Sequence, residues 1–336
     1  MTAEVLSIDT PAQFQQAVGR AAELLRAGQL VALPTETVYG LAANAWNEEA
    51  VRRIYEAKGR PSENPIIVHV ASFALARRCV SVWPPGASRL AAAFWPGPLT
   101  LVLPRSQEIP PLVTAGGGTV GVRWPNHPLI QAVIQACGFP LAAPSANRSN
   151  ELSPTTAEHV RKSLGTRIPL IIDGGPSCVG IESSVVDLAS MPARLLRPGM
   201  ISAESLQAVL GEGAVEISGA PSPIARSPGQ WPRHYSPKAK LAVLLWRDEA
   251  DLAAQVSAFG VARQQIHVLT HHRVPLREVF GRIAVIPAEA EACARALYAE
   301  LHRCDEAGAE LIIVEAPPKA EQWEAIADRL RRASHD

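Results

Sequence analysis

The sequence predicts an α/β protein of two domains, and three observations support this. Short apolar runs typical of buried strands alternate with longer segments of helical periodicity in both halves of the 336-residue chain. Between residues 212 and 239 prolines and glycines are frequent, and neither period is present. After residue 240 strands and helices alternate regularly. We therefore expect domains over 1–211 and 240–336, joined by a proline-rich linker over 212–239.

In the first domain, helix starts are marked by residues that cap N-termini well. Asn47, Ser72 and Ser202 each precede a segment of helical periodicity, and Thr155 with Glu158 forms a capping box. Helices are expected at 14–27, 48–58, after 72, and at 87–94, 128–137, 155–165 and 202–210. Strands are expected at 30–33, 66–70, 99–103, 119–124, 141–143, 169–173, 183–188 and 194–196. This mixture indicates a sheet with hairpins in its second half.

The second domain has a simpler pattern. Its expected strands are 241–246, 266–269, 283–286 and 311–314, and its expected helices are 249–259, 289–303 and 319–332. Alternation of this kind is typical of a small Rossmann-like domain with a parallel sheet.

Composition is that of an ordinary soluble globular protein, with 47% hydrophobic and 19% charged residues. The 32 basic and 32 acidic residues balance, so no overall field draws the chain to nucleic acid or to an anionic membrane. The apolar runs are too short to cross a bilayer, and the N-terminus lacks a secretory pattern. The five cysteines form no CxxC pair, which fits reduced thiols. We expect a cytoplasmic protein without membrane association or stable nucleic-acid binding.

The clearest chemical signal is a pair of cations at a predicted helix end. Lys58 and Arg60 flank Gly59, where the helix would stop, and Pro61 prevents its continuation. With the hydroxyl of Ser62 and the amide of Asn64 they form a compact anion receptor suited to phosphate. The alternative is a solvated turn whose charges only favour a helix C-terminus. Since a cation on a turn is not part of a core, we expect its replacement to affect folding little.

Two other polar features are unusual for their positions. The strand at 141–143 leads into small hydroxyl residues over 145–155, which could form a nest for a phosphate or only a polar turn that caps a helix. Arg123 lies on the otherwise apolar strand 119–124. A strand arginine of this kind needs a partner, either an internal acid or an anionic substrate.

Together these motifs resemble the YrdC-like family. The residues that carry the resemblance are PTETVYG at 34–40, Lys58-x-Arg60, Asn64-Pro65, His69 and Ser145-x-Asn147. The linker segments Ser227-Pro228-Gly229 and His234-Tyr235, with the domain after Lys240, resemble the family's long form, the two-domain L-threonylcarbamoyladenylate synthases. The similarity runs from about residue 14 to residue 330, with the motifs in order. It implies a twisted open-sheet catalytic domain with a concave, positive cavity.

The resemblance also implies a nucleotidyltransferase reaction. L-threonine, bicarbonate and ATP, with Mg²⁺, would give threonylcarbamoyl-AMP and pyrophosphate. The product would supply the threonylcarbamoyladenosine modification of tRNA through a downstream tRNA threonylcarbamoyl transferase complex. Such chemistry needs no protein nucleophile, and catalysis would be mostly positioning and electrostatics. His69 is a candidate general base, although a binding role suits it better.

The family pattern assigns residues to each substrate. It places threonine near Thr37, His69, Arg123, Ser183 and the backbone of Ala143. It places ATP near Lys58, Arg60, Asn64, Thr119, Ser145, Asn147, Ser153, Arg197 and Tyr235. No protein ligand for a metal is implied. Because the threonine carbamate and its adenylate are labile in water, we expect linker residues 228–237, with Tyr235, to act as a lid over the site.

Two other functions are alternatives to this one. An RNA-binding module would use the same cavity for RNA phosphates, but zero net charge and few aromatics among basic residues argue against it. A carbamoyl-phosphate-using carbamoyltransferase, as in the related domain of hydrogenase maturation proteins, would add zinc-finger cysteine pairs and an acylphosphatase part. The chain contains neither.

Overall fold

The computed structural model describes residues 2–217, 236–275 and 280–334. The chain divides into two compact units, one of residues 1–149 and 153–231 and the other of residues 150–152 and 232–336. Part of the expected linker is regular structure, since Val215–Ile217 form strand β11 beside β10 (Ala193–Arg197). Most of that linker, including the expected lid residues 228–235, lies outside the described residues.

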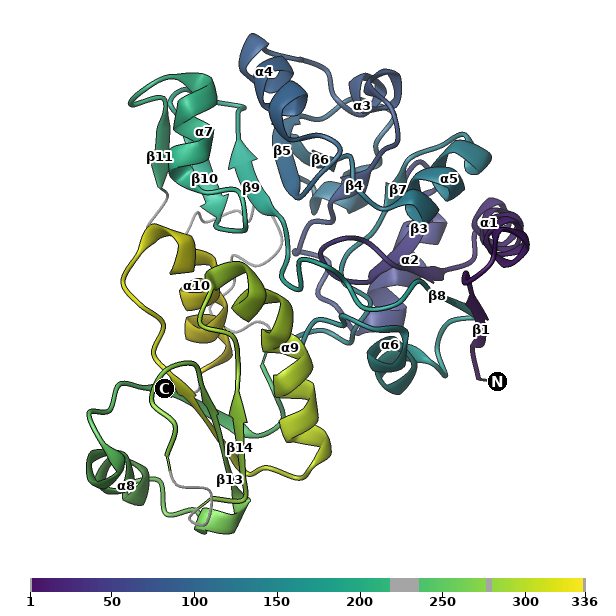
Figure 1. Ribbon diagram of the computed structural model, residues 1–336. Helices are drawn as coiled ribbons and strands as arrows, with labels where there is room; N and C mark the ends of the chain where they lie inside the picture. The colour runs from purple at the N-terminus through teal and green to yellow at the C-terminus, as the bar shows by residue number, and fades with distance from the viewer. Residues whose placement is uncertain (1, 218–235, 276–279, 335–336) are drawn as a thin grey trace. The chain divides into compact units, whose positions relative to one another are not determined.

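The first unit is built on one mixed sheet, with strand order β1-β8-β2-β3-β7-β4-β6-β5-β9-β10-β11 (Figure 1). Its other strands are β1 (Glu4–Ser7), β2 (Val31–Leu33), β3 (Gly40–Asn44), β4 (Val68–His69), β5 (Leu99–Pro104), β6 (Thr119–Arg123), β7 (Leu141–Ala142), β8 (Leu170–Asp173) and β9 (Ser184–Asp187). The expected hairpin in the second half is present, because β9 and β10 pair antiparallel.

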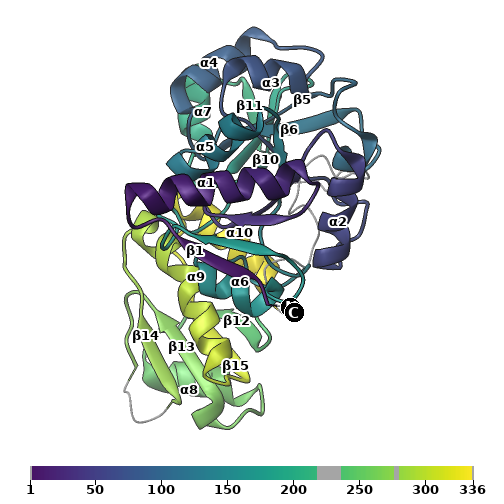
Figure 2. The ribbon, with the colours of Figure 1, turned by 90° about the vertical axis from the view of Figure 1, so that its right-hand side faces the viewer.

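Helices cover both faces of this sheet. They are α1 (Pro11–Arg26), α2 (Glu48–Lys58), α3 (Phe73–Cys79), α4 (Pro85–Phe94), α5 (Pro128–Cys137), α6 (Ala157–Leu164) and α7 (Ala203–Leu210), with a 3₁₀ turn at Pro111–Thr114. Successive strand side chains point to opposite faces. Val31 and Leu33 accordingly pack in a core with α1 and α5, whereas Ala32 packs in the core on the other face. Figure 2 views this unit from the side of α1.

Two local predictions were wrong in detail. The N-cap of α6 is Thr156, whose hydroxyl accepts from the amide of His159, so Glu158 is one position too early for the expected capping box. Glu158 instead pairs with Arg161 on the helix surface. Strand β3 lies where no strand was expected, because its small residues carry no β signal and its pairing with β2 and β7 decides its conformation.

The second unit contains a four-stranded parallel sheet of order β12-β15-β13-β14, which confirms the predicted Rossmann-like architecture. The elements are β12 (Lys240–Leu244), α8 (Glu249–Ser257), η2 (Arg263–Gln265), β13 (Ile266–Thr270), β14 (Arg282–Val285), α9 (Ala290–Glu306), β15 (Leu311–Glu315), η3 (Glu321–Trp323) and α10 (Glu324–Ala333). Helix α10 starts five residues later than expected, after the two prolines that follow β15 and the short η3 turn. None of the described helices is long and apolar enough to span a membrane.

Candidate active site

His69 and Arg123 are brought together by strand register. Strands β4 and β6 are parallel, and these residues lie opposite one another at the carboxyl ends of the two strands. Ala143 follows β7, on the other side of β4, where its amide donates to the carbonyl of Ile67 at 3.0 Å. Three of the five residues predicted for threonine therefore lie on, or directly after, neighbouring strands of one sheet.

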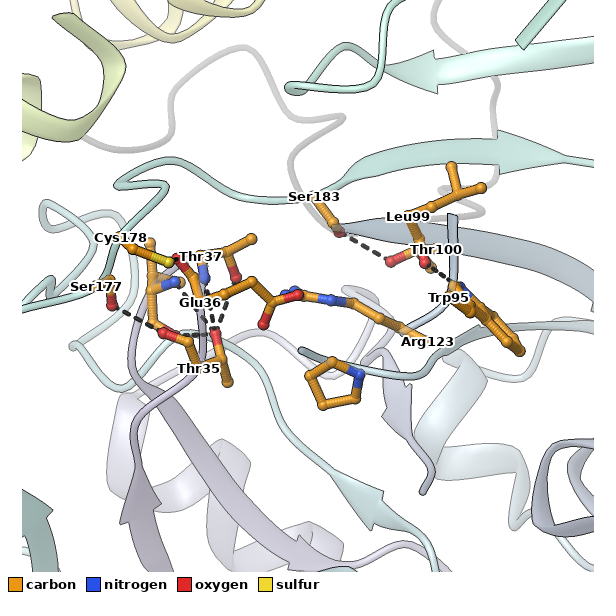
Figure 3. Close-up of polar contacts among 12 residues, drawn as sticks. Thr35, Glu36, Thr37, Trp95, Leu99, Thr100, Arg123, Ser177, Cys178 and Ser183 are labelled. Carbon is orange, nitrogen blue, oxygen red and sulfur yellow. Dashed lines mark hydrogen bonds and ion pairs between the residues drawn. The ribbon is translucent and has the colours of Figure 1, made fainter. Parts of the chain in front are cut away.

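The partner of Arg123 is an internal acid, which the sequence left as one of two alternatives. Arg123 Nη2 lies 2.8 Å from Glu36 Oε1, and both side chains are buried. Figure 3 shows the two side chains pointing toward each other. Within the described residues, neither oxygen of Glu36 and neither Nε nor Nη2 of Arg123 has a partner in hydrogen-bond geometry. Buried polar atoms are normally satisfied, so this pair has hydrogen-bonding capacity that a polar ligand could use.

The loop before β3 holds Glu36 and Thr37 in place through Thr35. The hydroxyl of Thr35 donates to the carbonyl of Val38 at 2.6 Å and accepts from the amide of Thr37 at 3.2 Å. The hydroxyls of Thr35 and Thr37 are 2.9 Å apart. From the other side, Ser177 Oγ donates to the carbonyl of Thr35 at 3.1 Å. This turn is fixed by side-chain to backbone bonds, so the Glu36 and Thr37 side chains have defined positions.

His69 is a neutral imidazole in this environment. Burial, and next the positive charge of Arg123, lower the pKa of His69 well below its usual value. Within the described chain neither ring nitrogen has a hydrogen-bond partner. A neutral ring with both nitrogens unused can bind a hydroxyl or amine, but its low pKa makes it a weak base. This environment favours a binding role over general-base catalysis.

The lowered pKa of His69 gives a stability prediction. Between its folded value and its unfolded value near 6.5, the unfolded chain binds the extra proton, so stability should fall as the pH drops below about 6.5. The slope from one such group is at most about 1.4 kcal/mol per pH unit. Urea unfolding between pH 5 and 7 should show a smaller slope for His69→Gln than for the wild type. The exposed His272→Gln is the control, and equal slopes in all three proteins would contradict the prediction.

Ser183 connects the two predicted substrate sets. Its hydroxyl lies 2.8 Å from Thr100 Oγ1 on β5 (Figure 3). Arg197, at the end of β10, donates from Nη2 to the same hydroxyl at 3.1 Å and from Nε to the Ser183 carbonyl at 3.1 Å. A residue predicted for threonine thus touches one predicted for ATP. Sequence reasoning missed Thr100, which looks like an ordinary strand residue.

Lys58 is buried, so the solvated-turn alternative is wrong. It is the last residue of α2, and Gly59 beyond it has the left-handed conformation that ends the helix. Lys58 Nζ donates to the carbonyl of Ser145 at 2.6 Å, to the carbonyl of Asn147, and to Asn147 Oδ1 at 3.2 Å. The expectation that this lysine could be removed with little effect on folding took it as a turn cation outside the core. That premise is wrong, because Lys58 is buried and tethers the loop after β7.

Arg60 and Asn64 form a similar closed unit. Arg60 is buried and donates from Nε to the carbonyl of Asn64 at 3.2 Å and from Nη2 to that of Pro65 at 2.9 Å. The side-chain oxygen of Asn64 is buried without a hydrogen-bond partner among the described residues. Arg60 and Asn64, which were both predicted to bind ATP, are therefore in contact. Arg60 also shapes the turn that leads to β4.

The remaining predicted ATP residues are more scattered. Thr119 is half-buried at the start of β6, on the same side of the strand as Arg123 and about 13 Å from it. The buried Ser153 hydroxyl donates to Glu182 Oε1, a contact that sequence reasoning did not predict. Tyr235 lies outside the described residues. In the part of the chain that the structure covers, no group of three or more His, Cys, Asp or Glu side chains could hold a metal ion.

Comparisons with known proteins cover both units. The Sua5/YciO/YrdC family model, described as telomere recombination, matches residues 23–199, and a model described as the C-terminal domain of threonylcarbamoyl-AMP synthase matches residues 201–335. The chain is 41% identical to the threonylcarbamoyl-AMP synthase of Pyrococcus abyssi, over 94% of this chain and 93% of that protein. For the Bacillus subtilis enzyme of the same name the identity is 42%, over 94% and 92%. The crystal structure of P. abyssi Sua5 complexed with L-threonine matches with a TM-score of 0.91 and 37% identity, over 99% of this chain and 98% of that one.

Proposed function

The chain belongs to the Sua5/YciO/YrdC family, in the two-domain form of the threonylcarbamoyl-AMP synthases, and from this premise we propose that it makes threonylcarbamoyl-AMP. The observation that carries the proposal is the buried Arg123–Glu36 pair beside His69, with its unused donors and acceptors. Such a group of polar atoms suits a small zwitterion that also carries a hydroxyl. Threonine is such a molecule.

The reaction needs one proton acceptor and no protein nucleophile. The threonine ammonium loses a proton, and the amine combines with bicarbonate to give a carbamate and water. A carbamate oxygen then attacks the α-phosphorus of ATP, the bond to the β-phosphate bridge breaks, and pyrophosphate leaves. The protein's part is to align the carbamate with the α-phosphate and to stabilise the charge that develops on the phosphates.

For threonine, the geometry suggests a role for each charged group. Arg123 can hold the carboxylate through two parallel N–H bonds. Glu36 lies 2.8 Å from Arg123, so a bare carboxylate would meet a like charge there. A ligand that brings its own ammonium removes this repulsion, which favours an α-amino acid over a simple hydroxy acid. His69, Thr37 and Ser183 would contact the hydroxyl side of threonine, with the backbone of Ala143 beside them.

For ATP, we propose the buried cations Lys58, Arg60 and Arg197 as the source of positive charge around the phosphates. Amides and hydroxyls would complete the nucleotide site, at Asn64, Thr119, Ser145, Asn147, Ser153 and Tyr235. We expect Mg²⁺ to arrive with the phosphates of ATP. The enzyme would act in the cytoplasm, with residues 1–211 as the catalytic part, and would pass its product to a tRNA threonylcarbamoyl transferase.

The proposal predicts that pyrophosphate release depends on threonine and bicarbonate together. The purified chain, with ATP and Mg²⁺, should release pyrophosphate only when both are present, and mass spectrometry should detect threonylcarbamoyl-AMP. Serine, valine and 3-hydroxybutyrate serve as controls for the methyl group, the hydroxyl and the amine. Equal release without an amino acid would contradict the assignment. Tight, salt-sensitive tRNA binding without ATP turnover would favour the RNA-binding alternative.

A further inference from the structure

The second unit has a cavity of about 480 Å³ at one edge of its parallel sheet. Each of the four strands is followed by residues that line it. Leu245 follows β12, His271 to Arg273 follow β13, Ala288 lies beyond β14, and Glu315 to Lys319 end and follow β15. In open α/β sheets, ligands bind in the crevice outside the carboxyl ends of the strands. The volume is also in the range of small-molecule sites.

The carboxylate of Glu315 is anchored in this cavity on one side only. Its Oε2 accepts from Thr270 Oγ1 at 2.6 Å and from the amides of His271, His272 and Arg273 at 2.9, 2.9 and 3.2 Å. Burial acts to raise the pKa of Glu315, but the hydrogen bonds from Thr270 and these amides outweigh it, and the pKa is lowered. The described hydrogen bonds all end on Oε2. Oε1 therefore remains an ionised acceptor on a cavity-lining residue.

The side chains of two cations in the cavity, Arg273 and Lys319, make few polar contacts with the described residues. Arg273 Nη1 is 3.9 Å from Glu315 Oε1, beyond hydrogen-bond distance, and the Arg273 side chain is 40% exposed. Lys319 is exposed and makes no ion pair among the described residues. Arg273 and Lys319 carry two positive charges against the single negative charge of Glu315, so the cavity keeps a net positive character. Two cations that line one cavity and have unused donors suit the oxygens of a phosphate group.

Apart from these charged groups and the imidazoles of His271 and His272, the lining is apolar. Leu245 is 65% exposed, which is unusual for a large aliphatic side chain, and it shares the cavity with Ala288, Pro317 and Pro318. A surface of this kind suits the flat face of a ring system. Inorganic phosphate alone would leave most of the 480 Å³ unfilled and this apolar wall uncovered.

We propose that this cavity is a second ligand site, separate from the catalytic chemistry, that binds a mononucleotide. The phosphate would bind to Arg273 and Lys319, a ribose hydroxyl would donate to Glu315 Oε1, and the base would lie on Leu245 and the two prolines. This assignment gives the second unit a function of its own and does not depend on the reaction proposed for the first.

Hydrogen–deuterium exchange of the full-length chain, titrated with AMP, tests the proposal because it shows which peptides AMP protects. AMP should protect peptides covering residues 271–275 and 315–319. Adenosine, which lacks the phosphate, and inorganic phosphate, which lacks the base, should each need at least about tenfold higher concentration for the same protection. Because catalytic residues fall in other peptides, the readout is independent of enzyme activity.

Variants then identify the residues that bind. Arg273→Ala/Lys319→Ala should raise the AMP concentration for half-protection at least about tenfold, since each charge-assisted contact contributes strongly. Lys240→Ala/Arg263→Ala removes two exposed cations near the amino ends of β12 and β13 and should leave the titration unchanged. Leu245→Glu, which leaves both cavity cations intact, should also weaken binding, because it places a charge against the base.

Three results would overturn the proposal. They are AMP-dependent protection confined to peptides of the first unit, equal AMP titrations for the wild type and Arg273→Ala/Lys319→Ala, and protection of residues 271–275 by a short single-stranded RNA but not by AMP. Protection by RNA but not by AMP would indicate that Arg273 and Lys319 bind a nucleic acid instead. The two proposals can fail separately. If pyrophosphate release did not require threonine while AMP still protected this cavity, the function proposed for the first unit would be contradicted and the second ligand site would be supported.

Discussion

Replacing Arg123 by leucine should lower kcat/KM for threonine by about two to four orders of magnitude and should also destabilise the first unit. Two charge-assisted hydrogen bonds to the threonine carboxylate, at about 1.5–3 kcal/mol each, account for the loss of activity. The loss of stability has another cause, because the variant leaves Glu36 as a buried carboxylate without its cation. Breaking a buried ion pair in this way costs about 3–5 kcal/mol.

The double variant Arg123→Leu/Glu36→Leu separates these two effects. Replacing both charges by apolar side chains removes the unpaired carboxylate, so much of the stability should return. Threonine-dependent pyrophosphate release should stay low, because the receptor for the carboxylate is still missing. Denaturant unfolding and steady-state kinetics of the wild type, the single variant and the double variant measure both quantities. A double variant with near wild-type activity would show that Arg123 has only a structural role.

Replacing Lys58 by methionine should lower turnover by one to two orders of magnitude and lower the melting temperature as well. In the folded protein Lys58 Nζ bonds to oxygens of Ser145 and Asn147, two residues of the proposed nucleotide site. Methionine keeps much of the apolar stem but leaves these oxygens without their donor and removes a positive charge from the site. Each lost charge-assisted bond is worth about 1.5–3 kcal/mol.

Two controls accompany this variant. Arg148→Ala removes an exposed cation from the same loop, next to Asn147, and should change neither turnover nor melting temperature appreciably. Lys58→Arg keeps the charge but not the compact ammonium geometry, so it should recover only part of the activity. Initial rates at varied ATP, with melting curves from the same preparations, are the measurements. Activity within a fewfold of wild type in Lys58→Met would remove this residue from the nucleotide site.

Features that depend on neighbouring residues could be read from the sequence. The caps Asn47, Ser72 and Ser202 accept from helix amides as predicted, because a cap and its helix lie within one turn of chain. The parallel sheet of the second unit follows from regular alternation of strands and helices. The need of Arg123 for a partner was also visible, since an arginine on an apolar strand is costly when unpaired.

Other features were decided by tertiary structure alone. The identity of the partner, Glu36, depends on a loop 87 positions earlier in the chain meeting the end of β6, which no local pattern encodes. The burial of Lys58 depends on the loop after β7 closing over a helix end, and strand β3 exists only because β2 and β7 supply its hydrogen bonds. Local sequence sets backbone preferences and amphipathic faces over a few residues. Pairing, burial and pKa are set by groups distant in the chain, and only the assembled sheet brings those groups together.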